Sequence, residues 1–221
     1  MVLGGCKDKE NISKKDGKES ESVEDKKTFT VGFDAEYPPY GYMDENGEYT
    51  GFDLELAEAV CELEGWELVK KPINWDSKDM ELNSGAIDCI WNGFTMNGRE
   101  EEYTFSTPYV DNSQVIVVAE KSGMKTLEDL QGKSVGVQAA SAALDLLQSE
   151  EEGGQKALAD TFSALNEFAD YNTAFTELQA GALDALAIDV GVANYQIKSR
   201  GEGYQILEET LNAEQYAIGF K

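Results

Sequence analysis

Hydrophobic and polar positions along the chain change their period repeatedly, and each change marks a short predicted element. Apolar residues alternate over 28–33, which is typical of a strand, and recur at helical spacing after Asp53, where Gly65 would end the helix. We expect Asp53 to be the N-cap of that helix. Further strands are expected at 68–71, 87–91, 113–119, 134–137, 165–168, 185–189, 204–207 and 216–220. Helical patterns separate most of these strands, so the sequence predicts an α/β fold with largely parallel sheets.

One ten-residue sequence motif occurs twice. Residues 81–90, ELNSGAIDCI, reappear at 177–186 as ELQAGALDAL, with five positions identical. In both copies a short helix ends at a glycine and a buried strand follows. A chance match is the alternative, because this order of elements is common. We expect a pseudo-repeat, in which two similar α/β units each contribute to one site.

Polar residues follow both repeated strands. Asn92, Thr95 and Arg99 follow the first strand, and Asp189 ends the second. Open α/β sheets bind ligands beyond the carboxyl ends of their strands. A guanidinium group binds a carboxylate through two parallel hydrogen bonds, and a carboxylate accepts an ammonium group. The two patches therefore suit an α-amino acid zwitterion.

Both charged residues also have simpler interpretations. Arg99 precedes Glu100, Glu101 and Glu102, and its alternative role is a surface ion pair. The alternative role of Asp189 is the N-cap of the next helix. Backbone groups at Gly93 and the helix start at Ser141 are further candidate contacts. Candidate aromatic walls are Tyr37, Tyr40, Trp75 and Trp91, of which Trp91 is expected to pack in the core.

Composition excludes several classes of function. The net charge is −25, and residues 7–27 are neutral, so the body of the chain is acidic and repels nucleic acid and anionic lipid. There is no histidine, and Cys6, Cys61 and Cys89 lack metal-ligand spacing. We expect no metal and no cofactor. Cys61 and Cys89 are expected to be packed thiols, and no apolar run is long enough to span a membrane.

The N-terminal segment predicts a tether. Residues 3–6, LGGC, resemble the lipobox of bacterial lipoproteins, in which the cysteine is lipidated, so Cys6 is the candidate anchor. Residues 7–27 are too polar to fold and should form a flexible linker. The expected location is the extracellular face of a bacterial cell membrane. The signal that normally precedes a lipobox is missing, so Met1 is expected to be a trimmed or artificial start.

From about residue 28 to its end, the chain resembles the family 3 solute-binding proteins of polar amino acid ABC transporters. The resemblance depends on the order and spacing of several motifs, which are GFDAEYPPY (32–40), GFDLELA (51–57), WNGFTMNGR (91–99), FSTPY (105–109), GKSVGV (132–137) and AID (187–189). It implies the type II periplasmic-binding-protein fold, with two α/β lobes joined by a two-strand hinge. Lobe 1 would be 28–112, lobe 2 would be 113–213, and 214–221 would return towards lobe 1.

The resemblance also implies roles for individual residues. Arg99 would bind the ligand carboxylate, helped by Thr95 and by amides near Gly93 and Ser141, and Asp189 would bind the ammonium group. Tyr37 and Trp75 would enclose the ligand side chain, and Asp34 would contact its distal end. The full expected ligand-binding set is Asp34, Tyr37, Trp75, Asn92, Gly93, Thr95, Arg99, Ser141 and Asp189.

The implied function is capture of an extracellular amino acid and its delivery to a transporter permease. An enzyme of the dehydratase type on the same fold and an amino-acid sensor ectodomain are the alternatives. The family normally ends with helices that pack on lobe 1, and the chain stops before them. We therefore expect a truncated chain with an exposed apolar face on lobe 1, unless a second, swapped or associated chain covers it.

Overall fold

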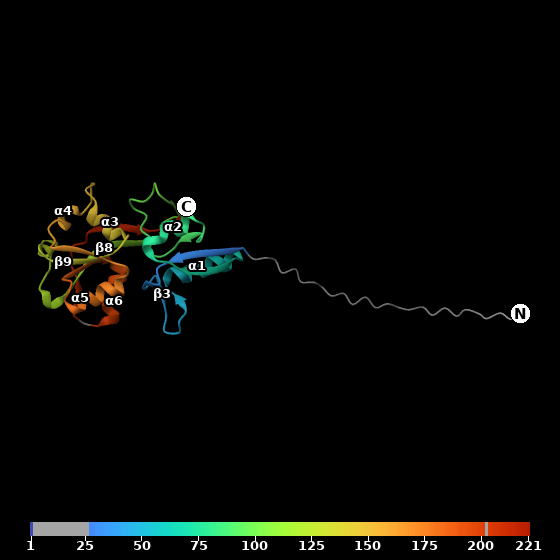
Figure 1. Ribbon diagram of the computed structural model, residues 1–221, viewed down its shortest axis with the longest axis horizontal. Coiled ribbons are helices and arrows are strands. Elements are labelled where there is room, and N and C mark those ends of the chain that lie inside the picture. Colours follow the sequence, from blue (N-terminus) through green and yellow to red (C-terminus); the bar gives the residue numbers. More distant parts are fainter. Residues whose placement is uncertain (2–26, 202) are drawn as a thin grey trace.

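Two β-sheets flanked by helices form the body of the molecule (Figure 1). The structure is a computed structural model that describes residues 1, 27–201 and 203–221. The expected lipidation site Cys6 and most of the expected linker lie outside the described residues. Within the described residues, no helix is long and apolar enough to cross a membrane.

Sheet 1 has the strand order β5-β1-β6-β14-β7. Its strands are β1 (Thr28–Phe33), β5 (Glu67–Pro72), β6 (Cys89–Ile90), β7 (Thr104–Phe105) and β14 (Gly219–Phe220). β1 is parallel to both β5 and β6, whereas β14 is antiparallel to β6. The helices of this part are α1 (Phe52–Glu64), a 3-10 turn (Trp75–Ser77) and α2 (Lys78–Asn83).

Sheet 2 has the order β10-β9-β11-β8-β12, and β13 also pairs with β8. Its strands are β8 (Val110–Ala119), β9 (Ser134–Gln138), β10 (Ala164–Phe168), β11 (Ala185–Asp189), β12 (Tyr204–Ile206) and β13 (Asn212–Tyr216). The helices α3 (Ala142–Gln148) and α4 (Lys156–Ala159) lie on one side of it, and α5 (Tyr171–Ala180) and α6 (Val190–Arg200) lie on the other (Figure 1). Two apolar clusters, one on each side, fill the space between sheet and helices.

Two antiparallel strands, β8 and β13, connect the two sheets. Beyond their paired region, Tyr216 accepts a backbone hydrogen bond from Tyr109 (3.0 Å) and forms a β-bridge with Thr95. The loop after β6 is thereby tied to the connecting strands. This pairing places the ends of β6 and β11 on opposite sides of one junction.

The repeated sequence motif has the same structural role in both sheets. The aspartate of the first copy, Asp88, accepts a hydrogen bond from the Thr30 amide (2.7 Å) at the start of β1. Asp184 accepts one from the Ser134 amide (2.9 Å) at the start of β9. Both glycines end their helices at positive φ, 75° at Gly85 and 79° at Gly181, a conformation that glycine adopts without steric penalty. The expected pseudo-repeat is confirmed as a repeated helix–strand packing unit.

Most predicted elements occur within a few residues of their expected positions, and three features differ. A small three-stranded sheet, formed by β2 (Glu36–Tyr37), β3 (Gly41–Met43) and β4 (Tyr49–Thr50), had no clear sequence signal. The single strand expected at 216–220 is two strands, β13 and β14. The N-cap of α1 is Gly51, so the assignment of Asp53 as its cap was wrong. Asp53 lies in the first turn with its carboxylate buried beneath the loop after β6.

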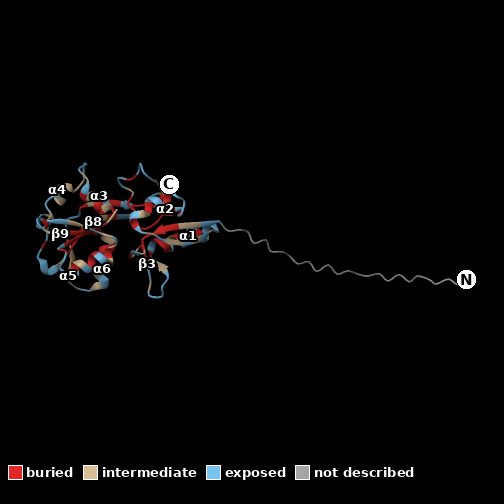
Figure 2. Ribbon diagram, viewed as in Figure 1, coloured by how far each residue is buried: buried red, intermediate tan, exposed pale blue. Residues whose placement is uncertain are grey.

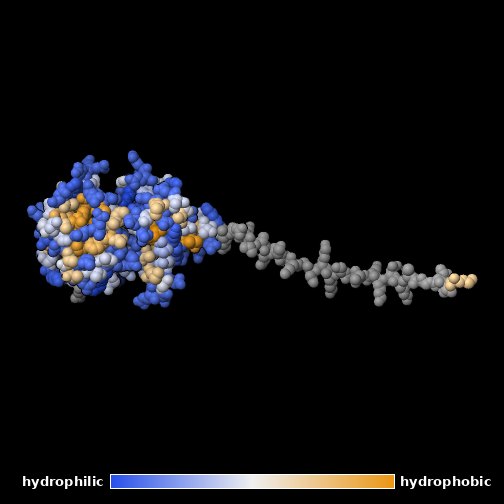
Figure 3. Space-filling view, in the orientation of Figure 1, coloured by the Kyte–Doolittle hydropathy of each residue, from blue (hydrophilic) through white to orange (hydrophobic). Residues whose placement is uncertain are grey.

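Buried residues concentrate on the sheets and on the helix faces that cover them (Figure 2). Cys61 and Cys89 are both buried and unpaired, as predicted for packed thiols. On the face that Figure 3 shows, hydrophilic residues surround several apolar patches. Exposed large apolar side chains of the sheet-1 part are Met43, Phe52, Val60, Leu63, Val69 and Met80. That a second chain covers these side chains stays a prediction.

Candidate functional site

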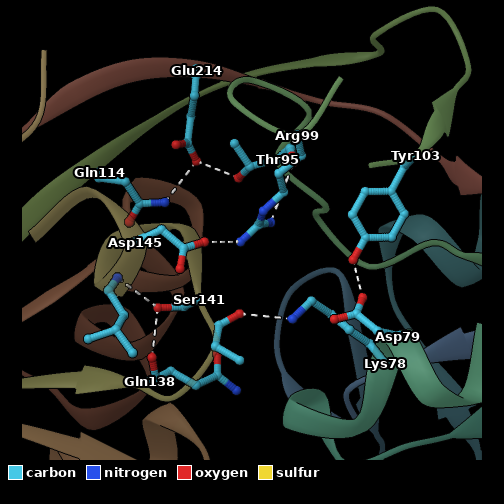
Figure 4. A network of polar contacts seen from close by, with 12 residues as sticks. Lys78, Asp79, Thr95, Arg99, Tyr103, Gln114, Gln138, Ser141, Asp145 and Glu214 are labelled. Carbon is cyan, nitrogen blue, oxygen red and sulfur yellow. Dashed lines mark hydrogen bonds and ion pairs between the residues drawn. The ribbon is translucent and has the colours of Figure 1, made fainter. Parts of the chain in front are cut away.

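The predicted site residues lie at the junction of the two sheets, on elements far apart in the sequence. Arg99 is on the loop after β6, and Asp189 is the last residue of β11. Both side chains are buried, with 9% of Arg99 and 4% of Asp189 exposed. Thr95 and Gln114 both donate hydrogen bonds to Glu214 (Figure 4), and Gln114 also donates to Asp189, so the two regions are connected. The structure thus places the two opposite charges in one polar network.

Arg99 points across the junction towards α3. Its Nη2 forms an ion pair with Asp145 Oδ2 at 2.7 Å, and its Nη1 donates to the Thr95 carbonyl at 3.5 Å (Figure 4). The guanidinium group also lies 5.1 Å from the ring of Phe94. The simpler interpretation, a surface ion pair with the adjacent glutamates, is not what the structure shows. The group is buried, and its carboxylate partner belongs to the opposite side of the junction.

Asp189 is held by three donors. Its Oδ1 accepts hydrogen bonds from Asn112 (2.8 Å), Gln114 (2.7 Å) and Tyr216 (2.6 Å). It occupies the N-cap position of α6 but makes no capping hydrogen bond, so helix capping does not explain this aspartate. Burial, followed by the nearby charge of Glu214, raises the pKa of Asp189 to about 6. A buried carboxylate of this kind is stabilised when a cation joins it.

Glu214 is a second buried carboxylate that sequence reasoning missed. Its Oε1 accepts hydrogen bonds from Thr95 (2.8 Å), and from the same Asn112 and Gln114 amide groups (both 2.8 Å) that bind Asp189. Glu214 is on β13, which was not expected as a strand here, so its inward direction had no sequence signal. Two carboxylates that share two amide donors make this end of the site strongly negative.

An acidic cavity of about 660 Å³ adjoins the junction. Trp75 and Asp34 both line it, and Glu36, Asp76, Glu81 and Asp170 add carboxylates to its wall. Asp34 accepts hydrogen bonds from the Glu36 amide (2.9 Å) and from Gln138 Nε2 (2.7 Å) on β9. Burial raises the pKa of Asp34 to about 6.

Tyr37 does not line this cavity with Trp75. It is buried in an apolar cluster that includes Tyr40 and Tyr171, and its hydroxyl lies 3.4 Å from that of Tyr216. The nearby Asp189 charge and, above all, burial raise its pKa well above the usual value. The expected pairing of Tyr37 and Trp75 around one side chain is therefore not formed. Tyr37 lies on the Asp189 side instead.

Asn92, Gly93 and Ser141 lie near the junction. Gly93 and Ser141 hydrogen-bond to other residues, and both polar atoms of the Asn92 side chain are buried without a hydrogen-bond partner among the described residues. The Asn92 side chain is buried against Gly41 within the sheet-1 part. The Gly93 amide donates to Asp53 Oδ2 at 2.5 Å, and its φ of 55° with Tyr37 and Tyr216 packed around it leaves room only for glycine. The Ser141 hydroxyl caps the seven-residue α3 by accepting from the Leu144 amide (3.2 Å).

Asp53 fixes the loop that carries Thr95 and Arg99, and its burial raises its pKa to about 7. Folding raises the pKa of this carboxyl group from its unfolded value near 4 to about 7. The folded state therefore loses stability as the pH rises through this range. We expect Asp53→Asn to remove this loss, so that urea unfolding shows the variant gaining stability relative to wild type between pH 5 and pH 8. A constant difference across that range would contradict a buried, titrating Asp53.

Lys78 and Asp145 are further residues of the junction that the sequence did not reveal. Lys78 opens α2, is 5% exposed, and donates to the Ala140 carbonyl at 3.1 Å across the junction (Figure 4). A lone lysine in a helix with acidic neighbours gave no reason to expect burial. Asp145 sits on α3, four residues after Ser141, at a position where a surface carboxylate is ordinary.

Two α/β sheets with oppositely charged groups at their junction are the architecture of a ligand-capture protein. A family model, "Bacterial extracellular solute-binding proteins, family 3", matches residues 29–189. The chain belongs to this family of transporter substrate-binding proteins, which are not enzymes. The dehydratase alternative is therefore set aside.

Individual relatives agree with this assignment. The L-cystine-binding protein TcyJ of Escherichia coli is 28% identical over 202 residues, which are 90% of this chain and 73% of that protein. The arginine-binding extracellular protein ArtP of Bacillus subtilis is 29% identical over 91% of this chain and 77% of its own length. A substrate-binding protein of Streptococcus pneumoniae, solved with bound histidine, superimposes with a TM-score of 0.81 at 35% identity, covering 88% of this chain and 79% of that one. The type II periplasmic-binding-protein fold is thus confirmed.

Proposed function

We propose that this protein captures an extracellular α-amino acid and delivers it to the permease of an ABC importer. The observation that carries the proposal is the pair of buried, opposite charges at one junction, Arg99 and Asp189, linked by one hydrogen-bond network. An amino acid zwitterion presents the complementary charges. The amino-acid ligands named for the relatives, among them cystine, arginine and histidine, support the same class.

Arg99 would bind the ligand carboxylate. Its guanidinium group now pairs with Asp145, whose side chain is 62% exposed and can be hydrated if the ligand displaces it. An incoming carboxylate would exchange with, or join, this partner at the same donors. Thr95 presents its hydroxyl beside Arg99 and would contribute to the same end of the ligand.

Asp189 would bind the ligand ammonium group. Its three present donors are neutral side chains, and none of them neutralises its charge. Glu214 adds a second negative charge within reach of the same amide groups. A cation that enters here relieves the repulsion between the two carboxylates, which is a favourable contribution specific to an ammonium-bearing ligand.

The acidic cavity would take the ligand side chain. Its wall of carboxylates with one tryptophan favours a polar or cationic side chain, because a cation gains both from opposite charges and from an aromatic face. Asp34 would contact the distal end of that side chain. Tyr37 would close the opposite side of the site, near the ammonium group.

Capture would involve hinge motion of the two connecting strands. We place the lobes at 28–112 and 113–213, with 214–221 returning to the first lobe, so that bending near residues 112 and 213 opens the junction. Contacts across the junction, such as Gln138 with Asp34, correspond to a closed arrangement. The closed form would be the one that docks on the permease, and Cys6 would tether the protein to the membrane.

A thermal-shift screen against the twenty common amino acids, cystine and ornithine tests this function. A ligand at 100 times its dissociation constant adds about 2.7 kcal/mol of stability, which raises the melting temperature of a domain of this size by about 5–10 °C. We expect one or a few amino acids, with polar or cationic side chains, to give such a shift. N-acetylated forms of the same amino acids, which lack the ammonium group, serve as controls and should give none. A flat screen would contradict the proposal.

A further inference from the structure

Lys78 is a buried cation that the proposed binding roles leave unused. Only 5% of the residue is exposed, and its Nζ lies 5.3 Å from the centre of the Trp75 ring. The ammonium group donates one hydrogen bond, to the Ala140 carbonyl at 3.1 Å on the other side of the junction. A lysine ammonium has three donor hydrogens, so this neutral acceptor satisfies only part of its capacity.

Lys78 forms none of the ion pairs found among the described residues. The charges of Asp79, Asp145 and Asp76 favour its ionised form, and the charge of Arg99 opposes it. Burial first, and then the charge of Arg99, lower the pKa of Lys78. Of these two buried cations, only Arg99 forms an ion pair, and its partner Asp145 is exposed.

A buried ammonium group without a directly bound counter-ion is unfavourable, and a second cation beside it makes it more so. A carboxylate between Lys78 and Arg99 would supply such a partner. Figure 4 shows both side chains extending from the sheet-1 part towards the same segment of the opposite side, where Ala140 and Asp145 meet them. The free donors of Lys78 therefore face the region in which the ligand carboxylate is expected.

We propose that Lys78 is a second carboxylate-binding cation, which holds the α-carboxylate of the ligand together with Arg99 while the Ala140 carbonyl keeps it in place. The inference rests on the proposed function, because it assigns a residue to the same site. It makes the cleft selective for a free α-carboxylate. A ligand with a carboxamide in its place would leave Lys78 without a directly bound anion.

Two substitutions separate the charge of Lys78 from its contact across the junction. Lys78→Gln keeps a hydrogen-bond donor for Ala140 but removes the charge, and Lys78→Met keeps only the packing of the stem. Each would be titrated by calorimetry with an amino acid and with its carboxamide, L-arginine and L-argininamide first, and then L-histidine and L-histidinamide. Both variants should retain the circular dichroism of wild type, because the charge serves the ligand and not the fold.

We expect both variants to lose about tenfold or more in affinity for the free amino acid, as one hydrogen bond between charged groups is removed. Affinity for the carboxamide should change less than about threefold, because that ligand never paired with the charge. Lys121→Gln, at an exposed lysine, is the matched control for net charge and should leave both affinities unchanged. Equal losses for acid and amide would overturn the inference and leave Lys78 as a contact between the lobes. A wild-type protein that binds neither acid, nor any amino acid of the screen, would instead refute the proposed function itself.

Discussion

Replacing Arg99 by alanine should abolish measurable amino-acid binding and leave the fold intact. The guanidinium group can give two charge-assisted hydrogen bonds to one carboxylate, each worth about 1.5–3 kcal/mol, so their loss weakens binding by about 100-fold or more. The fold should survive because the one ion pair that disappears has an exposed partner, Asp145, which water can solvate. Calorimetry with the amino acid selected by the screen measures the loss, and circular dichroism checks the fold.

The chain offers a matched control for this experiment. Arg200 is the only other arginine, and it lies on α6, where it contacts Gln196 and the ring of Phe175. Arg200→Ala removes the same group and the same charge outside the proposed carboxylate site, and should retain the wild-type affinity. Retained affinity in Arg99→Ala would exclude Arg99 as the carboxylate ligand. Equal losses in both variants would point to net charge as the cause.

The sequence was sufficient to predict the residues whose positions depend on nearby residues of the chain. Arg99 and Asp189 follow strands whose hydrophobic pattern is clear, and the ends of strands in an α/β sheet meet at one edge. The start of α3 at Ser141 was also predicted, because an N-cap depends on the residues of the turn that follows it. Such signals act within one element or between neighbouring ones.

Residues whose role depends on packing between distant segments were not predictable in this way. Lys78, Asp145 and Glu214 look like ordinary surface positions until the two sheets are brought together. The direction of a side chain beyond the end of a strand was equally hard to predict, because a shift of one residue turns the side chain to the opposite face. The Asn92 amide therefore lies against Gly41 inside the sheet-1 part. Asp53 was misassigned for a related reason, since its partner, the Gly93 amide, is 40 positions away.

Asp189→Asn should weaken amino-acid binding by about 100-fold and remove the part of its pH dependence that arises from Asp189. The ammonium group of the ligand would lose an ionised partner in a buried site, where a charged hydrogen bond contributes about 1.5–3 kcal/mol and the direct charge attraction adds to it. The aspartate carboxylate in wild type has a pKa raised to about 6, so it is ionised at pH 7.5 and largely protonated at pH 5. Only the ionised form attracts an ammonium group.

The direction of the pH effect follows from this pKa. Between pH 5 and 8 L-arginine keeps the charges of its carboxylate, ammonium and guanidinium groups, so with this ligand the titrating groups belong to the protein. As pH falls through about 6, Asp189 must release a proton before it can bind the ligand, and affinity should fall by up to about tenfold for each further unit. Calorimetry at pH 7.5 and pH 5 in wild type measures this loss.

Asp34 complicates the pH profile, because its pKa is also raised to about 6 and it lines the cavity for the ligand side chain. Asp34→Asn is therefore the informative comparison. It should keep the pH dependence that arises from Asp189, whereas Asp189→Asn should lose that part and Asp160→Asn, at an exposed aspartate, should change nothing. If Asp189→Asn keeps the wild-type pH profile and Asp34→Asn flattens it, the ammonium group binds elsewhere. The acidic cavity, rather than the carboxylate pair at the hinge, would then be the cation site of this protein.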